Sequence, residues 1–185
     1  TIVVSEQVLS FALDVADRTR TVAALRGFDV VMDGLTIALN GPAAAAIAEA
    51  GCHGVNLNGF GEEKQSDATF RAAGKIMVAG FGMTPGTTNL MAMHAANQLD
   101  RVEAVRVSHG AYRPIAFSAS IAETTRYEYD PALPGRCVYE DGQFKQVPPF
   151  ARPRVIQLPP PYGALPQYII PHNETFCLAE TLQDK

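Results

Sequence analysis

Several residue types are scarce in this 185-residue chain, and each scarcity excludes a class of protein. It has no tryptophan and only three cysteines, Cys52, Cys137 and Cys177, which are far apart and odd in number. They fit the reduced thiols of a cytoplasmic protein better than a disulfide framework. Neither these cysteines nor the four histidines have the spacing of metal ligands. We therefore predict a cytoplasmic protein without a metal site.

Charge is also sparse, at 18% of the residues, and the formal net charge is −4. Nucleic acids are bound largely through lysine and arginine, and the sequence contains no basic patch, so we predict no nucleic-acid partner. No apolar run reaches the length of a membrane span, so we expect no membrane association. The hydrophobic content of 47% is ample for a packed core, and the length suggests one large domain or one and a half.

The first hundred residues alternate strand and helix patterns. Repeated strand–helix units of this length imply a parallel sheet with right-handed crossovers, and short apolar strands are typical of a sheet covered on both faces. Asp17 is expected to cap the first helix and Gly51 to end the second. The expected strands cover residues 8–16, 29–33, 54–57 and 75–79, and the expected helices cover 19–26, 42–50, 66–73 and 87–99.

After residue 100 the pattern changes. A half-buried strand is expected over 103–109, a helix over 118–129, and a hairpin over 138–144 that turns at Asp141-Gly142. Proline then accumulates, which favours extended edges and loops. The expected fold is thus α/β: a partial Rossmann-type parallel sheet in residues 1–100, followed by an α+β domain with an antiparallel sheet in residues 101–185.

The loop after the fourth expected strand is the most informative feature. Gly80, Gly82, Pro85 and Gly86 break the pattern within seven residues, and a long helical run follows. Open α/β sheets bind ligands at this place, because unpaired backbone N–H groups converge at the carboxyl edge of the sheet. An ordinary structural turn is the alternative, and we favour the ligand-facing loop.

Four segments resemble the saccharopine dehydrogenase-like family, of the saccharopine reductase and lysine 6-dehydrogenase type. They are residues 28–51, the "GF-x-PG-x-x-N" turn at 80–90, residues 127–142, and an "H-x-E" strand at 171–175. The resemblance implies an NAD(P)-dependent oxidoreductase that transfers hydride at the C–N bond of an amino-acid substrate. It also implies that residues 1–100 bind the dinucleotide, and that residues 101–185 bind the substrate and form a homodimer.

The sequence departs from the family in two places. The phosphate-binding fingerprint G-x-G-x-x-G is absent, and no helix fits between residues 1–7 and the strand expected at 8–16. We therefore expect a fragment that lacks the first strand–helix unit. Where the family has "V-D-x-S", this chain has Val55-Asn56-Leu57-Asn58. A carboxylate that could orient an ammonium group is thereby replaced by neutral amides.

The resemblance places a site for NAD or NADP along the strand ends. Asp14 and Val15 would edge the adenine, although Asp14 and Asp17 could equally serve only to cap a helix. Leu35 and Thr36 would lie near the phosphates and the nicotinamide ribose. The nicotinamide side would be lined by Asn58 and Phe81, with the core as the alternative place for Phe81.

The loop and the second domain supply the expected substrate site. Arg113 could clamp a substrate carboxylate bidentately, and His109 or Tyr112 could transfer protons, with plain solvation as the alternative. His172 and Glu174 would share one face of a strand, as a catalytic pair or, as we prefer, a structural one. We assign no catalytic residue. The expected substrate-binding residues are Gly82, Met83, Thr84, Pro85, Asn89, for which a structural role is preferred, and Arg113.

The sequence is also compatible with other functions. A polyamine-forming relative would use the same fold, and a carbonyl or ene reductase would use a similar nucleotide domain. A non-catalytic remnant or dimerisation module would bind no nucleotide. The sequence does not choose between NAD and NADP, nor does it identify the amino acid.

Overall fold

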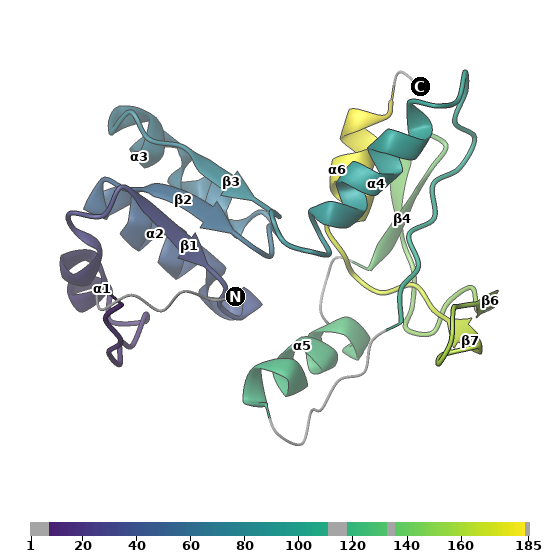
Figure 1. Ribbon diagram of the computed structural model, residues 1–185, viewed down its shortest axis with the longest axis horizontal. Helices are drawn as coiled ribbons and strands as arrows, with labels where there is room; N and C mark the ends of the chain where they lie inside the picture. The colour runs from purple at the N-terminus through teal and green to yellow at the C-terminus, as the bar shows by residue number, and fades with distance from the viewer. Residues whose placement is uncertain (1–7, 111–117, 133–135, 184–185) are drawn as a thin grey trace.

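A computed structural model describes residues 8–110, 118–132 and 136–183 (Figure 1). Its first part is a three-stranded parallel sheet in the order β1-β2-β3, formed by β1 (Val30–Asp33), β2 (His53–Asn56) and β3 (Met77–Ala79). Strand–helix alternation had predicted a parallel sheet here, and this prediction is confirmed.

Three helices accompany these strands, as the local signals predict: the first precedes β1, and the other two join successive strands. They are α1 (Arg18–Leu25), α2 (Asn40–Ala50) and α3 (Asp67–Ala72), with short 3₁₀ turns η1 (Ile37–Leu39) and η2 (Glu62–Ser66). The Asp17 side chain accepts a hydrogen bond from Arg20 N (3.1 Å), as an N-cap does. At the end of α2, Gly51 adopts the left-handed conformation with φ of 77°.

One face of the sheet carries the core. Ile47, Cys52 and Phe70 are buried there, and Val31 and Met77 pack against them from the strands. On the opposite face Val30 and Met32 are 56% and 67% exposed. The expectation of strands covered on both faces is therefore wrong for the described residues. Right-handed crossovers that run in one direction across a sheet put their helices on the same side, so α2 and α3 share one face.

Two expected strands are absent from the described residues. Residues 8–13 are irregular and lead into a turn before α1, and residues 103–109 form no strand either. Leu9 is 87% exposed, which fits a segment without a neighbour. An extended pattern becomes a strand only where another strand pairs with its backbone, and neither segment has such a partner among the described residues.

The second part contains helices and hairpins. In chain order they are α4 (Thr87–Ala96), α5 (Ala119–Tyr129), β4 (Cys137–Glu140), β5 (Gln143–Gln146), β6 (Arg154–Gln157), β7 (Ala164–Gln167) and α6 (Glu174–Thr181). The antiparallel prediction is confirmed, in the form of two separate two-stranded sheets, β4-β5 and β6-β7. The helix predicted from residue 118 is also found, with the Ser118 hydroxyl accepting from Ile121 N (3.2 Å).

The strand expected at residues 171–175 is wrong, because this segment leads directly into α6. His172 and Glu174 therefore lie at the beginning of a helix rather than alternating along a strand. Figure 1 shows α4 beside α6, and the two helices pack together. Because α4 follows directly from the loop after β3, this packing brings the loop next to the start of α6.

Candidate functional site

A buried polar network holds the carboxyl ends of β1 and β2 together. Asn56 donates through Nδ2 to Asp33 Oδ2 (2.8 Å) and accepts through Oδ1 from the backbone of Asn58 (2.8 Å) and Gly59 (2.6 Å). Both Asp33 and Asn56 are buried. Asn56 thus uses both of its polar atoms within the framework, where it shapes the turn that follows β2.

The turns after these two strands are cross-linked. Asn58 donates through Nδ2 to the Leu35 carbonyl (2.7 Å) and to Asn40 Oδ1 (3.2 Å). Leu35 N in turn donates to Asp33 Oδ1 (2.9 Å). These hydrogen bonds fix Leu35 and Asn58 side by side at the carboxyl edge of the sheet.

The Gly82–Gly86 turn closes on itself. Gly82 N donates to the Pro85 carbonyl (2.8 Å), Thr87 N to the Gly82 carbonyl (3.0 Å), and Gly86 N to Asn89 Oδ1 (2.9 Å). Gly86 has φ of +125°, and a Cβ there would lie 2.2 Å from the Gly82 carbonyl oxygen. The expectation that these N–H groups are open to a ligand is therefore wrong. The glycines serve the turn itself, and Asn89 has the structural role.

A carboxylate at the start of α6 joins this loop to the second part. Glu174 is 4% exposed, and its Oε1 accepts from the hydroxyls of Thr84 (2.6 Å) and Thr88 (2.5 Å). Its Oε2 contacts Nδ1 of His172. Burial would raise the pKa of Glu174, but the hydrogen bonds from His172, Thr84 and Thr88 lower this pKa to about 2. Glu174 is therefore ionised at neutral pH.

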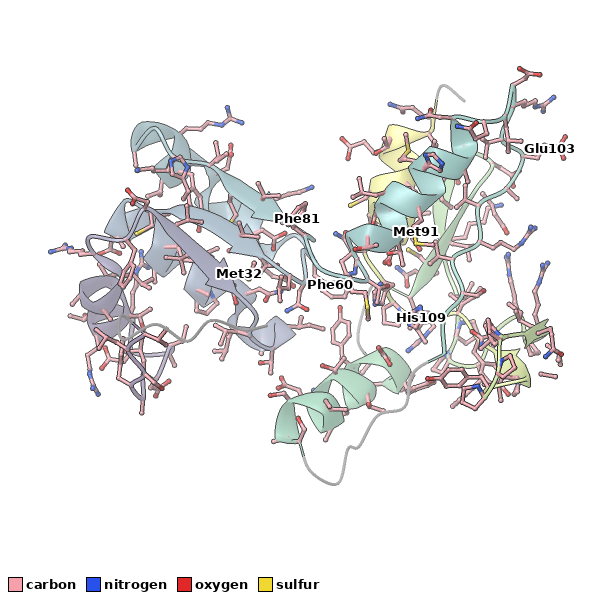
Figure 2. All side chains as sticks on the ribbon, viewed as in Figure 1. Met32, Phe60, Phe81, Met91, Glu103 and His109 are labelled. Carbon is pink, nitrogen blue, oxygen red and sulfur yellow. The ribbon has the colours of Figure 1, made fainter. Side chains whose placement is uncertain are left out.

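A cleft of about 160 Å³ lies between the sheet edge and the second part. Figure 2 labels Phe60 and His109 at this junction. The Phe60 and Tyr127 rings meet edge to face in its wall, with centroids 5.5 Å apart, and those of His109 and His172 do the same at 5.8 Å. Among the residues lining the cleft are Leu35, Thr36, Asn58, Thr84, Pro85, His109 and His172.

The cleft brings together part of the predicted site. Leu35, Thr36 and Asn58 from the expected cofactor side line the same space as Thr84 and Pro85 from the expected substrate side. Sequence reasoning missed the contributions of Phe60, Thr124, Tyr127, Glu128 and Pro171. The only signal for any of these was that Tyr127, Glu128 and Pro171 fall in two of the segments that resemble the family.

Other predicted residues lie elsewhere. Phe81 and Met83 are 59% and 77% exposed and do not line this cleft, and the core alternative for Phe81 is wrong as well. Asp14 and Val15 form a turn before α1, where Asp14 Oδ1 accepts from Ala16 N (3.0 Å), so they do not end a strand. Arg113 lies outside the described residues, as does Tyr112.

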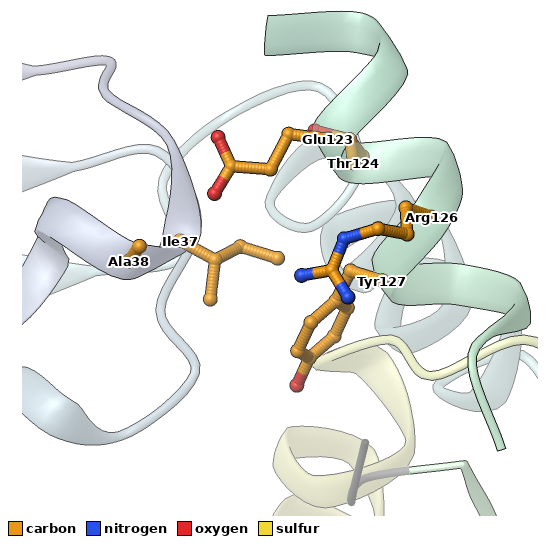
Figure 3. A pocket seen from close by; sticks show the side chains of 6 residues that line it. All are labelled: Ile37, Ala38, Glu123, Thr124, Arg126 and Tyr127. Atoms are coloured by element: carbon orange, nitrogen blue, oxygen red, sulfur yellow. The ribbon is translucent and has the colours of Figure 1, made fainter. Parts of the chain in front are cut away.

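A second hollow adjoins the cleft (Figure 3). Side chains from η1 and α5 face each other across it, with Ile37 on one side and Glu123, Arg126 and Tyr127 on the other. It shares Ile37, Thr124 and Tyr127 with the cleft. The two hollows are therefore neighbours that share part of one wall.

Comparison with models of known protein families finds no match for this chain. Within the described ranges, no helix has both the length and the apolar character needed to cross a bilayer. The same ranges contain no group of three or more histidine, cysteine, aspartate or glutamate side chains arranged for a metal ion.

The cleft fits only part of a nicotinamide cofactor. Its mixed lining of Leu35, Thr36 and Asn58 suits a nicotinamide ring with its carboxamide. A pyrophosphate needs several open backbone N–H groups, and those of Gly82, Gly86 and Thr87 are already bonded within the loop. The Gly82–Gly86 loop therefore offers no cradle for a pyrophosphate.

Proposed function

We propose that this chain forms the substrate side of an NAD(P)-dependent oxidoreductase that transfers hydride at the C–N bond of an amino acid. The observation that carries this proposal is the cleft at the carboxyl edge of the parallel sheet, where residues after all three strands meet His109 and His172. Ligands of open α/β sheets bind at this edge. The resemblance to the saccharopine dehydrogenase-like family supports the same function.

Each part of the cleft has a role in this function. A bound nicotinamide would supply the hydride acceptor or donor. Thr36 and Asn58 would position its ring from the sheet side, while His172 and the buried carboxylate of Glu128 would face the amino acid. Phe60, Pro85 and Tyr127 would exclude water from the reacting atoms. The work of these residues is mainly positioning, because hydride transfer needs little acid–base help beyond the amine proton.

Cofactor binding tests this function. We expect NADH or NADPH to bind weakly, because the cleft holds only the ring end of the cofactor, and cofactor fluorescence measures this binding. Thr36→Phe fills the cleft with an aromatic ring and should weaken binding at least about tenfold, equivalent to about 1.4 kcal/mol. Thr69→Phe, on the exposed surface of α3, is the matched control and should leave the affinity unchanged. No binding of either cofactor at millimolar concentration, or equal binding by both variants, would contradict the proposal.

One observation favours a second candidate, a module that binds no nucleotide. The Gly82–Gly86 loop, which was expected to face a ligand, uses the N–H groups of Gly82, Gly86 and Thr87 internally, which is the behaviour of a structural turn. The same titration separates the two candidates, since this module would leave the fluorescence of both cofactors unchanged.

A further inference from the structure

The carboxylate of Glu174 orients the imidazole ring of His172. Both carboxylate oxygens of Glu174 are engaged, Oε1 by Thr84 and Thr88 and Oε2 by His172. The side chain is 6% exposed, against 19% for that of His172. Glu174 is therefore shielded from a ligand in the cleft, whereas His172 lines it. The Glu174 carboxylate therefore affects a ligand in the cleft through its hydrogen bond to the His172 imidazole.

The contact with Glu174 also fixes which nitrogen of His172 carries the proton. An ionised carboxylate only accepts hydrogen bonds, so Nδ1 of His172 must be the donor. In the neutral ring the lone pair is then on Nε2. No hydrogen bond among the described residues engages Nε2, and the ring lies at the cleft wall. The cleft wall therefore contains a nitrogen base, Nε2 of His172, and the buried carboxylate of Glu174 holds the ring through Nδ1.

We propose that Nε2 of His172 accepts a proton from the ammonium group of an amino-acid substrate in this cleft, with Glu174 as its positioning residue. This inference rests on the proposed function only for the nature of the ligand. In the step, one N–H bond of the ammonium breaks and its electron pair stays on the substrate nitrogen. An Nε2–H bond forms, and His172 becomes an imidazolium beside the Glu174 carboxylate. In the reverse direction the same proton returns to the nitrogen.

The neighbouring groups set the conditions for this transfer. Among the described residues, the titratable side chains that contact His172 or line the same cleft are Glu174, His109, Tyr127 and Glu128. Burial, and then the charge of Glu62, raise the pKa of Tyr127, so the phenol stays neutral at neutral pH. The ionised carboxylate of Glu174 places negative charge next to the cleft, which favours a cationic ligand. Thr84 and Thr88 couple this arrangement to the loop after β3, where the substrate was expected.

Nitrogen NMR of the histidine side chains tests the orienting role without any cofactor. At a pH where the ring is neutral, we expect His172 to show the tautomer with the proton on Nδ1. In Glu174→Gln the second tautomer should gain at least a comparable population, because a neutral amide no longer selects the donor. Glu180→Gln, an exposed position on the same helix, is the control and should leave the tautomer unchanged. A wild-type His172 protonated on Nε2 would overturn the proposal.

Addition of L-lysine as a probe tests whether an ammonium group reaches Nε2. We expect the Nε2 resonance of His172 to shift as that of a bare nitrogen does when it accepts a hydrogen bond, while exposed His94 is unaffected. Lysine that shifts cleft amides without shifting Nε2, or that fails to bind at millimolar concentration, would overturn the proposal. With a turned-over substrate, His172→Gln should lower kcat by about a hundredfold with little change in KM.

NADH titration of the same samples distinguishes the failure of this inference from failure of the proposed function. NADH binding without a lysine-induced shift of Nε2 would support the oxidoreductase and exclude the role of His172. A lysine-induced shift of Nε2 without binding of NADH or NADPH would support an amine-binding site and exclude the oxidoreductase.

Discussion

Replacing Glu174 with glutamine is expected to destabilise the fold by about 3 kcal/mol at neutral pH, a cost that disappears in acid. The pKa of Glu174 is about 2 in the folded chain against an ordinary 4.5, because hydrogen bonds from His172, Thr84 and Thr88 favour the ionised form over the effect of burial. A carboxyl group with a lowered folded pKa stabilises the fold above its unfolded pKa. This stabilisation is lost as pH falls from about 4.5 to about 2.

Chemical denaturation at neutral pH and at several values between 4.5 and 2 measures this effect. The difference in unfolding free energy between wild type and Glu174→Gln should shrink steadily over that window. Glu180→Gln, exposed on the same helix, should differ from wild type by less than about 0.5 kcal/mol throughout. A Glu174→Gln difference that stays constant in acid would show that ionisation of this group does not stabilise the fold.

Asn56→Asp, which introduces the residue of the resembled family, should destabilise the chain by about 4 kcal/mol. The new carboxylate would replace an amide nitrogen that lies 2.8 Å from Asp33 Oδ2, inside a fully buried network. Two carboxylates in such a site cannot both ionise without a large cost, so one of them should take up a proton. The destabilisation should therefore become smaller as the pH falls.

A double variant that exchanges the residues at positions 33 and 56 tests whether the two carboxylates cause the loss of stability. In Asn56→Asp with Asp33→Asn, one carboxylate again faces one amide, so most of the lost stability should return. Asn97→Asp, exposed at the end of α4, controls for the added charge and should cost less than about 0.5 kcal/mol. If Asn56→Asp is as stable as wild type at neutral pH, Asn56 is not the framework residue that its hydrogen bonds indicate.

Local signals predicted most elements of the parallel sheet and its helices. Asp17 and Gly51 cap helices where the sequence places them, because capping depends on a single side chain or backbone conformation. The expected strands at residues 8–16 and 103–109 failed, because strand formation depends on a distant partner. The alternation of His172 and Glu174 favours a strand, but the segment is too short for its pattern to distinguish a strand from the first turn of a helix.

The candidate site was predicted in part for a similar reason. The carboxyl ends of neighbouring parallel strands meet by geometry, so Leu35, Thr36 and Asn58 could be grouped from the strand order alone. The direction of a side chain within a turn is not encoded in a hydrophobic pattern, so the exposure of Phe81 and Met83 was not foreseen. Thr84 and Thr88 contact Glu174, which lies 90 and 86 residues further along the chain. No local sequence pattern indicates a contact between residues so far apart.

A nicotinamide ring is proposed to bind in the cleft between the sheet edge and the second part, and mapping of backbone amide chemical shifts on addition of NADH tests this binding. The largest changes should fall at Leu35, Thr36 and Asn58, which line the cleft, together with the His172 side chain. Changes confined to the exposed face that carries Val30 and Met32, or no changes at all, would contradict it.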